Sequence, residues 1–149
     1  MRRRDPELGR TPAGEPVDPA DVVTRLRAAM PVSAVILFGS RATGEYTQHS
    51  DYDLAVVSPA FANEPRMFRR AEALFGALGE VRGVDPVGLA PDELDALEGL
   101  LVLDVVADGL PLFDDGCFAR ARARLAELRA AGAVERLRGG WRSEGARGG

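Results

Sequence analysis

Two aspartates, Asp51 and Asp53, stand one residue apart where an apolar run begins, and they are the residues of this chain best suited to chemistry. Because strand side chains alternate between faces, both carboxylates are expected to point the same way. Neighbouring carboxylates repel each other and are costly to bury unpaired. Mg²⁺ relieves that repulsion, since it takes oxygen ligands from carboxylates and from substrate phosphates. The pair therefore predicts a metal site for phosphoryl-type chemistry, in which two ions can hold the attacking and leaving oxygens.

A Gly39–Ser40 turn ends the preceding apolar run, ten residues before Asp51. A residue without Cβ lets backbone approach a ligand closely. Ser40 offers a hydroxyl and a backbone N–H where a helix is expected to begin, which favours an anion, and Arg41 adds a fixed positive charge. Taken singly, a Gly-Ser pair or an Asp-x-Asp is commonplace. Their joint spacing indicates that the turn binds phosphates while the carboxylates bind metal.

The elements that must position these residues follow from hydrophobic periodicity and capping signals. We expect helices over 18–30, 66–79, 91–109 (with Gly99 as a possible break) and 117–138, and strands over 34–38, 53–57, 81–90 and 110–113. This order predicts the α/β (α+β) class, with a small mixed β-sheet flanked by helices. We divide the chain into a flexible leader (1–17), a core (18–116), a C-terminal helix (117–138) and a disordered tail (139–149), in which Trp141 either anchors a contact or is disordered.

Composition excludes several other chemistries. All 19 basic residues are arginine, which excludes a lysine-containing phosphate loop and Schiff-base catalysis. One cysteine, Cys117, and one histidine, His49, are too few for a Cys/His zinc site. Residues 11–117 carry a net charge of −11 and residues 118–149 a net charge of +5. Since the body is acidic, nucleic acid is not expected as a direct ligand. No apolar run is long enough to cross a bilayer, and we expect a cytoplasmic protein.

At this point the stretch "GSRATGEYTQHSDYDL", residues 39–54, resembles the G-S-x(10)-D-x-D signature of the DNA polymerase beta-like nucleotidyltransferase superfamily. It is most similar to the minimal nucleotidyltransferase (MNT) group. The ending "LDVVADGLPLFDD", residues 103–115, is also similar to that group, and the resemblance covers roughly residues 20 to 116. It implies the polymerase beta-like fold, with Mg²⁺ as cofactor and ATP as the donor.

The resemblance also implies roles for individual residues. The first two aspartates of the signature, Asp51 and Asp53, would bind the metal ions, and Gly39 and Ser40 would contact the nucleotide phosphates. A third carboxylate on a later strand would complete the metal site and help activate the attacking hydroxyl, and Asp85 is the candidate.

Pro86, which directly follows Asp85, departs from the pattern of the group. Proline cannot donate a hydrogen bond to a sheet ladder. Two alternatives stay open: this strand lies at the edge of the sheet, or Asp85 is a turn residue and the third carboxylate is misplaced.

Together these features predict a nucleotidyltransferase that moves a nucleoside monophosphate, AMP from ATP, to a hydroxyl and releases pyrophosphate. We see no second domain for recognising an acceptor, so we expect a partner to supply it. The resemblance implies the antitoxin of a HEPN/MNT toxin–antitoxin pair, with AMP placed on a tyrosine of the HEPN-type toxin. Two alternatives remain: a catalytically weak, binding-only antitoxin, and a small-molecule adenylyltransferase acting on an aminoglycoside-like hydroxyl.

Overall fold

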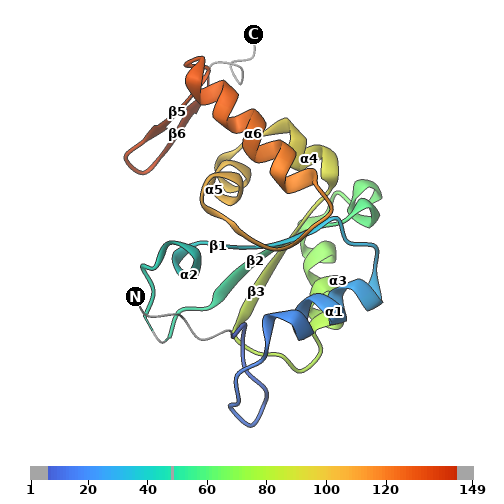
Figure 1. Cartoon of the computed structure of the whole chain (residues 1–149). Helices are drawn as coiled ribbons and strands as arrows, with labels where there is room; N and C mark the ends of the chain where they lie inside the picture. The colour runs from blue at the N-terminus through green and yellow to red at the C-terminus, as the bar shows by residue number, and fades with distance from the viewer. Residues whose placement is uncertain (1–6, 48, 144–149) are drawn as a thin grey trace.

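The computed structural model describes residues 7–47 and 49–143 (Figure 1). Along the chain its elements are α1 (Pro19–Ala29), β1 (Ala34–Phe38), α2 (Ser40–Thr43), β2 (Tyr52–Val57), the 3₁₀ helix η1 (Pro59–Asn63), α3 (Met67–Leu78), β3 (Val84–Leu89), α4 (Pro91–Ala96), α5 (Leu100–Asp108), β4 (Leu110–Asp114), α6 (Cys117–Ala130), β5 (Val134–Leu137) and β6 (Gly140–Ser143). None of the helices in the described ranges combines the length and the apolar character that a membrane span requires.

The central sheet has the strand order β3-β2-β1-β4. Strand β1 pairs antiparallel with β2 and with β4, whereas β2 and β3 are parallel. A parallel pair needs a crossover connection, which η1 and α3 provide. This small mixed sheet flanked by helices confirms the predicted fold class.

Helices cover both faces of the sheet (Figure 1). Ile36 and Ala55 pack into a core with α4, α5 and α6, while Val35 and Val56 pack into a second core with α1 and α3. Because both faces are covered, β1 and β2 are nearly continuous apolar runs, as predicted for buried strands. Asp53 is the half-buried polar exception in β2.

Strand β3 lies at the edge of the sheet, which explains how it accommodates Pro86. The carbonyls of Gly83 and Leu89 accept hydrogen bonds from β2-side amides. Since backbone groups alternate along a strand, the nitrogen of Pro86 points away from β2 and its missing N–H interrupts no ladder bond. The edge-strand alternative is therefore the correct one.

The predicted helix over 91–109 is interrupted, as its glycine suggested. Helix α4 ends at Ala96, Leu97 adopts a left-handed conformation with φ 51°, and α5 begins after Gly99, whose φ is 90°. The break turns α5 so that Val102, Val105 and Val106 can pack beneath α6 against the sheet.

The expectation of a flexible leader over 1–17 is wrong for residues 7–17. Leu8 is fully buried, and its N–H donates to the carbonyl of Val17. Gly9 approaches the start of β3 so closely that a Cβ would lie 2.6 Å from the Arg82 carbonyl oxygen. The buried side chain of Leu8 and the close approach of Gly9 together hold this segment against the start of β3. Residues 1–6 lie outside the described residues.

The chain after α6 also differs from expectation. The helix predicted over 117–138 ends at Ala130, because Gly132 with φ 79° leads the chain out of the helix. Residues 134–143 form the β5–β6 hairpin, not a helix end and a disordered tail. The hairpin is held on α5 by an Arg136–Asp108 ion pair and a Trp141–Asp104 hydrogen bond. Residues 144–149 of the predicted tail lie outside the described residues.

Candidate active site

Three carboxylates meet where β2 and β3 begin. Tyr52 and Leu54 are buried on the α1/α3 side of the sheet, so Asp53 faces the opposite side. Asp51 directly precedes β2, two residues before Asp53. The parallel register places Asp85 directly beside Asp53. The structure thus brings together the three aspartates that the sequence singled out.

These carboxylates influence one another electrostatically. Burial, then Asp85, then Asp51 raise the pKa of the Asp53 carboxyl above its ordinary value. Asp53 is half-buried and the other two are exposed. The neighbouring negative charges disfavour the ionised form of Asp53, and a cation bound among the carboxylates would reverse that effect. A donor set made only of carboxylate oxygens suits Mg²⁺.

Gly39 brings the turn into direct contact with this group. It follows β1 with φ 74° and ψ −156°, a conformation that favours glycine. A Cβ on residue 39 would lie 2.2 Å from Oδ2 of Asp53. Phe38 pairs with Asp53 across the two strands, so the strand register itself sets this approach. The glycine is therefore required twice, by its backbone angles and by the carboxylate beside it.

Arg41, which was predicted to contact phosphate, contacts the loop that leads from α2 to Asp51. Its Nε and Nη2 both donate to the Ser50 carbonyl, at 3.2 and 2.9 Å. Its guanidinium lies over the rings of Tyr46 and Tyr52, at 4.2 and 4.1 Å from their centroids. Arg41 thus fastens the segment that leads into Asp51. The geometry supports a positioning role, and contact with a phosphate stays a prediction.

Tyr52, one of the two aromatic partners of Arg41, is itself anchored. Its hydroxyl donates to Oε2 of Glu7 at 2.8 Å. Burial, then the hydrogen bond to Glu7, raise the pKa of Tyr52 to about 12, so the phenol stays protonated at neutral pH. The segment 7–17 therefore supports the residue between Asp51 and Asp53.

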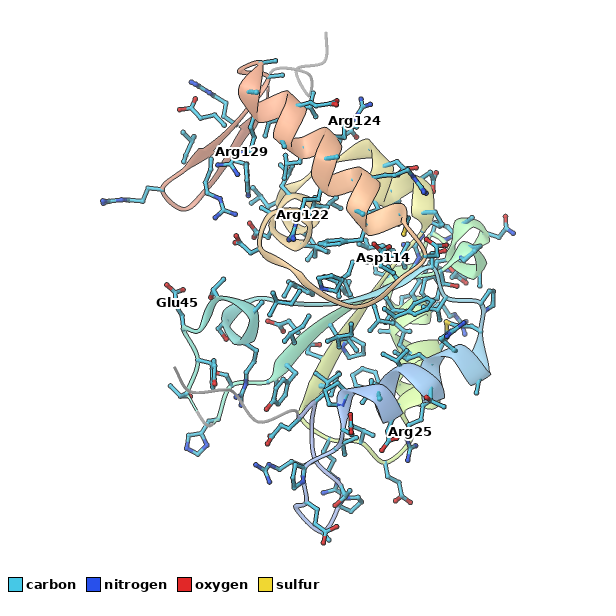
Figure 2. All side chains as sticks on the ribbon, in the orientation of Figure 1. Arg25, Glu45, Asp114, Arg122, Arg124 and Arg129 are labelled. Atoms are coloured by element: carbon cyan, nitrogen blue, oxygen red, sulfur yellow. The ribbon has the colours of Figure 1, made fainter. Side chains whose placement is uncertain are left out.

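A cleft of about 460 Å³ opens next to the turn. One wall is formed by the turn, by α2 and by Glu45, which follows α2 (Figure 2), and the other by α5 and the β5–β6 hairpin. Its lining residues are Gly39, Ser40, Thr43, Glu45, Leu100, Asp104, Asp108, Arg136, Leu137, Gly139, Gly140 and Trp141. Sequence reasoning missed the hairpin part of the second wall, because it assigned residues 134–138 to the end of a helix and residues 139–143 to a tail. A signal that could have found the hairpin is the Gly139–Gly140 pair, because Gly-Gly marks turns.

A second acidic group has a structural explanation. In the described part of the chain, the ligand atoms of Asp114, Asp115 and Cys117 all lie within 4.8 Å of one another, and the three aspartates of the site are not grouped so tightly. Asp114, at the start of α6 (Figure 2), accepts hydrogen bonds from the backbone N–H groups of residues 116, 118 and 119. Burial, then Asp115, raise the pKa of the Cys117 thiol to about 12, so the thiol is protonated at neutral pH. This group caps a helix.

Comparison with known proteins gives a family and a set of similar folds. Residues 20–106 match the family model described as nucleotidyltransferase domain. No match was found among curated proteins. A putative nucleotidyltransferase from Sulfolobus solfataricus is 24% identical, with 63% of this chain and 75% of that chain covered and a TM-score of 0.49. One chain of a solved toxin–antitoxin structure with AMP-PNP is 22% identical (77% of this chain and 92% of that chain covered, TM-score 0.47). One chain of the solved structure of a tri-AMPylated Shewanella oneidensis HEPN toxin in complex with MNT antitoxin is 25% identical (76% and 87% covered, TM-score 0.43).

The family match covers more than half of the chain. It includes the glycine turn and the three aspartates that the fold brings together. The chain belongs to the nucleotidyltransferase domain family.

Proposed function

We propose that this protein transfers AMP from ATP, with Mg²⁺, to a hydroxyl group of a partner protein. The observation that carries the proposal is the contact of Gly39 with Asp53, flanked by Asp51 and Asp85. It unites a turn where phosphate can approach backbone with the carboxylates that would hold the metal.

In the proposed reaction, the acceptor oxygen attacks the α-phosphorus of ATP. The bond from that phosphorus to the bridging oxygen breaks, and pyrophosphate leaves. Bound Mg²⁺ would neutralise the developing charge on the phosphates. Asp51, Asp53 and Asp85 would supply its carboxylate ligands. Asp85, exposed beside Asp53, would also accept the proton of the acceptor hydroxyl. The residues thus act by positioning and charge neutralisation.

The acceptor that we propose is a tyrosine of a HEPN-type toxin, and the transfer would make this chain an antitoxin. This assignment rests on the resemblance of the 39–54 motif to the minimal nucleotidyltransferase group. The solved complexes named above make such a toxin the first acceptor to test. Cytoplasmic location belongs to the same proposal.

The experiment mixes the protein with its HEPN-type genomic neighbour, Mg²⁺ and ATP labelled on the α-phosphate. We expect label on the neighbour, and a loss of at least about a hundredfold in rate for Asp53→Asn. The control is Asp95→Asn, which removes an exposed carboxylate of α4 outside the cleft. Toxin neutralisation without any label would replace the transferase by a binding-only antitoxin. Label on an aminoglycoside without a protein partner would instead support small-molecule transfer.

A further inference from the structure

The β5–β6 hairpin faces the turn across the cleft and is fixed in that place by polar contacts. Nε1 of Trp141 donates to Oδ1 of Asp104 at 2.9 Å. Nη2 of Arg136 donates to Oδ2 of Asp108 at 2.9 Å. Asp104 and Asp108 are four residues apart on α5, so they lie one helical turn apart on one face. The hairpin is therefore a docked wall of the cleft.

Arg136 is the basic residue among those that line the cleft, against Glu45, Asp104 and Asp108. Its guanidinium lies over the Trp141 ring, 4.5 Å from the centroid. A guanidinium carries five N–H donors, and Asp108 accepts from one of its nitrogens, Nη2. The ring and the carboxylate hold the cation in one orientation, so less side-chain entropy is lost when it binds a ligand.

We propose that the hairpin is the second wall of the nucleotide site and that Arg136 binds the phosphates of the nucleoside triphosphate opposite Gly39–Ser40. This inference rests on the proposed function. The volume of the cleft lies within the range of ordinary small-molecule sites. A triphosphate brings several negative charges into a cleft that already holds three acids. Since the chain has no lysine, a preoriented arginine supplies the compensating charge and the paired donors that phosphate accepts.

The test uses the intrinsic fluorescence of Trp141, which is the single tryptophan of the chain and lines the cleft. We expect Mg²⁺–ATP to change this fluorescence in the unmodified protein. Arg136→Gln should weaken ATP binding about tenfold or more, as loss of a charge-assisted hydrogen bond predicts, while adenosine binding stays within about twofold. The matched control is Arg138→Gln, which removes an exposed arginine of the hairpin turn that does not line the cleft.

Asp108→Asn separates phosphate binding from hairpin docking. It removes a negative charge from the cleft but keeps the cation and a side-chain oxygen that can still accept from Nη2 of Arg136, so we expect ATP to bind at least as tightly as in the unmodified protein. If Asp108→Asn weakens ATP as much as Arg136→Gln does, Arg136 only anchors the hairpin and the inference is overturned. It is also overturned if ATP and adenosine lose affinity equally, or if Arg136→Gln and Arg138→Gln bind ATP alike.

Equilibrium dialysis with labelled ATP distinguishes this inference from the proposed function. If the unmodified protein binds ATP and Arg136→Gln binds it equally tightly, this inference is overturned and the proposed function is not. If the unmodified protein does not bind ATP in the presence of Mg²⁺, both this inference and the proposed function are overturned. Circular dichroism of each variant checks that it is folded.

Discussion

Replacing Gly39 by alanine should damage the site through two separable effects. The first is backbone strain, because residue 39 has φ 74° and ψ −156°; a non-glycine residue held in such a conformation costs about 1–3 kcal/mol. The second is a collision, because the new Cβ would lie 2.2 Å from Oδ2 of Asp53, whereas ordinary contact begins at 3.4 Å. The carboxylate and residue 39 must therefore separate by about 1 Å, a displacement that can cost about a hundredfold in rate.

Gly44→Ala is the matched control. Gly44 also has a positive φ, of 89°, but a Cβ there meets nothing within 4 Å. The Gly44→Ala variant should therefore lose stability through backbone strain and keep most of its activity. Urea denaturation measures the free energy of unfolding of both variants, and release of pyrophosphate in the presence of the acceptor measures their rates. The reasoning is refuted if Gly39→Ala transfers AMP as fast as Gly44→Ala.

Three further predictions concern pH, loop anchoring and a buried ion pair. Because the pKa of Asp53 is raised, its ionised carboxylate opposes folding, and this penalty disappears as the pH falls below 3.8. Asp53→Asn should therefore raise the melting temperature at pH 7 but not near pH 3, and should weaken the stabilisation of the fold by Mg²⁺. Arg41→Lys should lower the free energy of unfolding by about 1–3 kcal/mol and speed proteolysis before β2, because lysine cannot donate twice to Ser50 while stacking between two rings. Glu93→Gln should lower the free energy of unfolding, measured in urea, by about 2–3 kcal/mol, because it leaves the guanidinium of Arg70, which is 2% exposed, without its carboxylate partner. This loss is smaller than for a fully buried pair. Since the hydrogen bond from Arg70 lowers the pKa of Glu93, the unmodified protein should lose this stability as the pH falls through that lowered pKa.

The strands that carry the candidate site could be predicted from the sequence, because short-range rules govern them. Alternation along a strand puts Asp51 and Asp53 on one face, and continuous apolar runs predict buried strands. The position of Asp85 beside Asp53 needed the parallel pairing of β2 with β3, which local pattern could not give. The family resemblance implied only a third carboxylate on a later strand. The same long-range pairing decides that Pro86 is harmless.

The second wall of the cleft could not be predicted in the same way. Arginine and alanine in α6 continue a helical pattern toward residue 138, and only the left-handed Gly132 stops it. The hairpin then depends on contacts with α5, which lies about 30 residues earlier in the chain. The contacts of Arg41 with Tyr46, Ser50 and Tyr52 could not be predicted for a related reason, since the loop from α2 to β2 follows a path that no local pattern sets.

The most direct measurement of the central claim is the binding of Mn²⁺, as a paramagnetic substitute for Mg²⁺, in the presence of a non-hydrolysable ATP analogue. The account predicts that asparagine at position 51, 53 or 85 weakens the ion by at least about tenfold, as expected for a lost carboxylate ligand. Asp115→Asn, in the acidic group that caps α6, should leave binding unchanged. Binding that survives Asp53→Asn and is lost in Asp115→Asn would contradict the account.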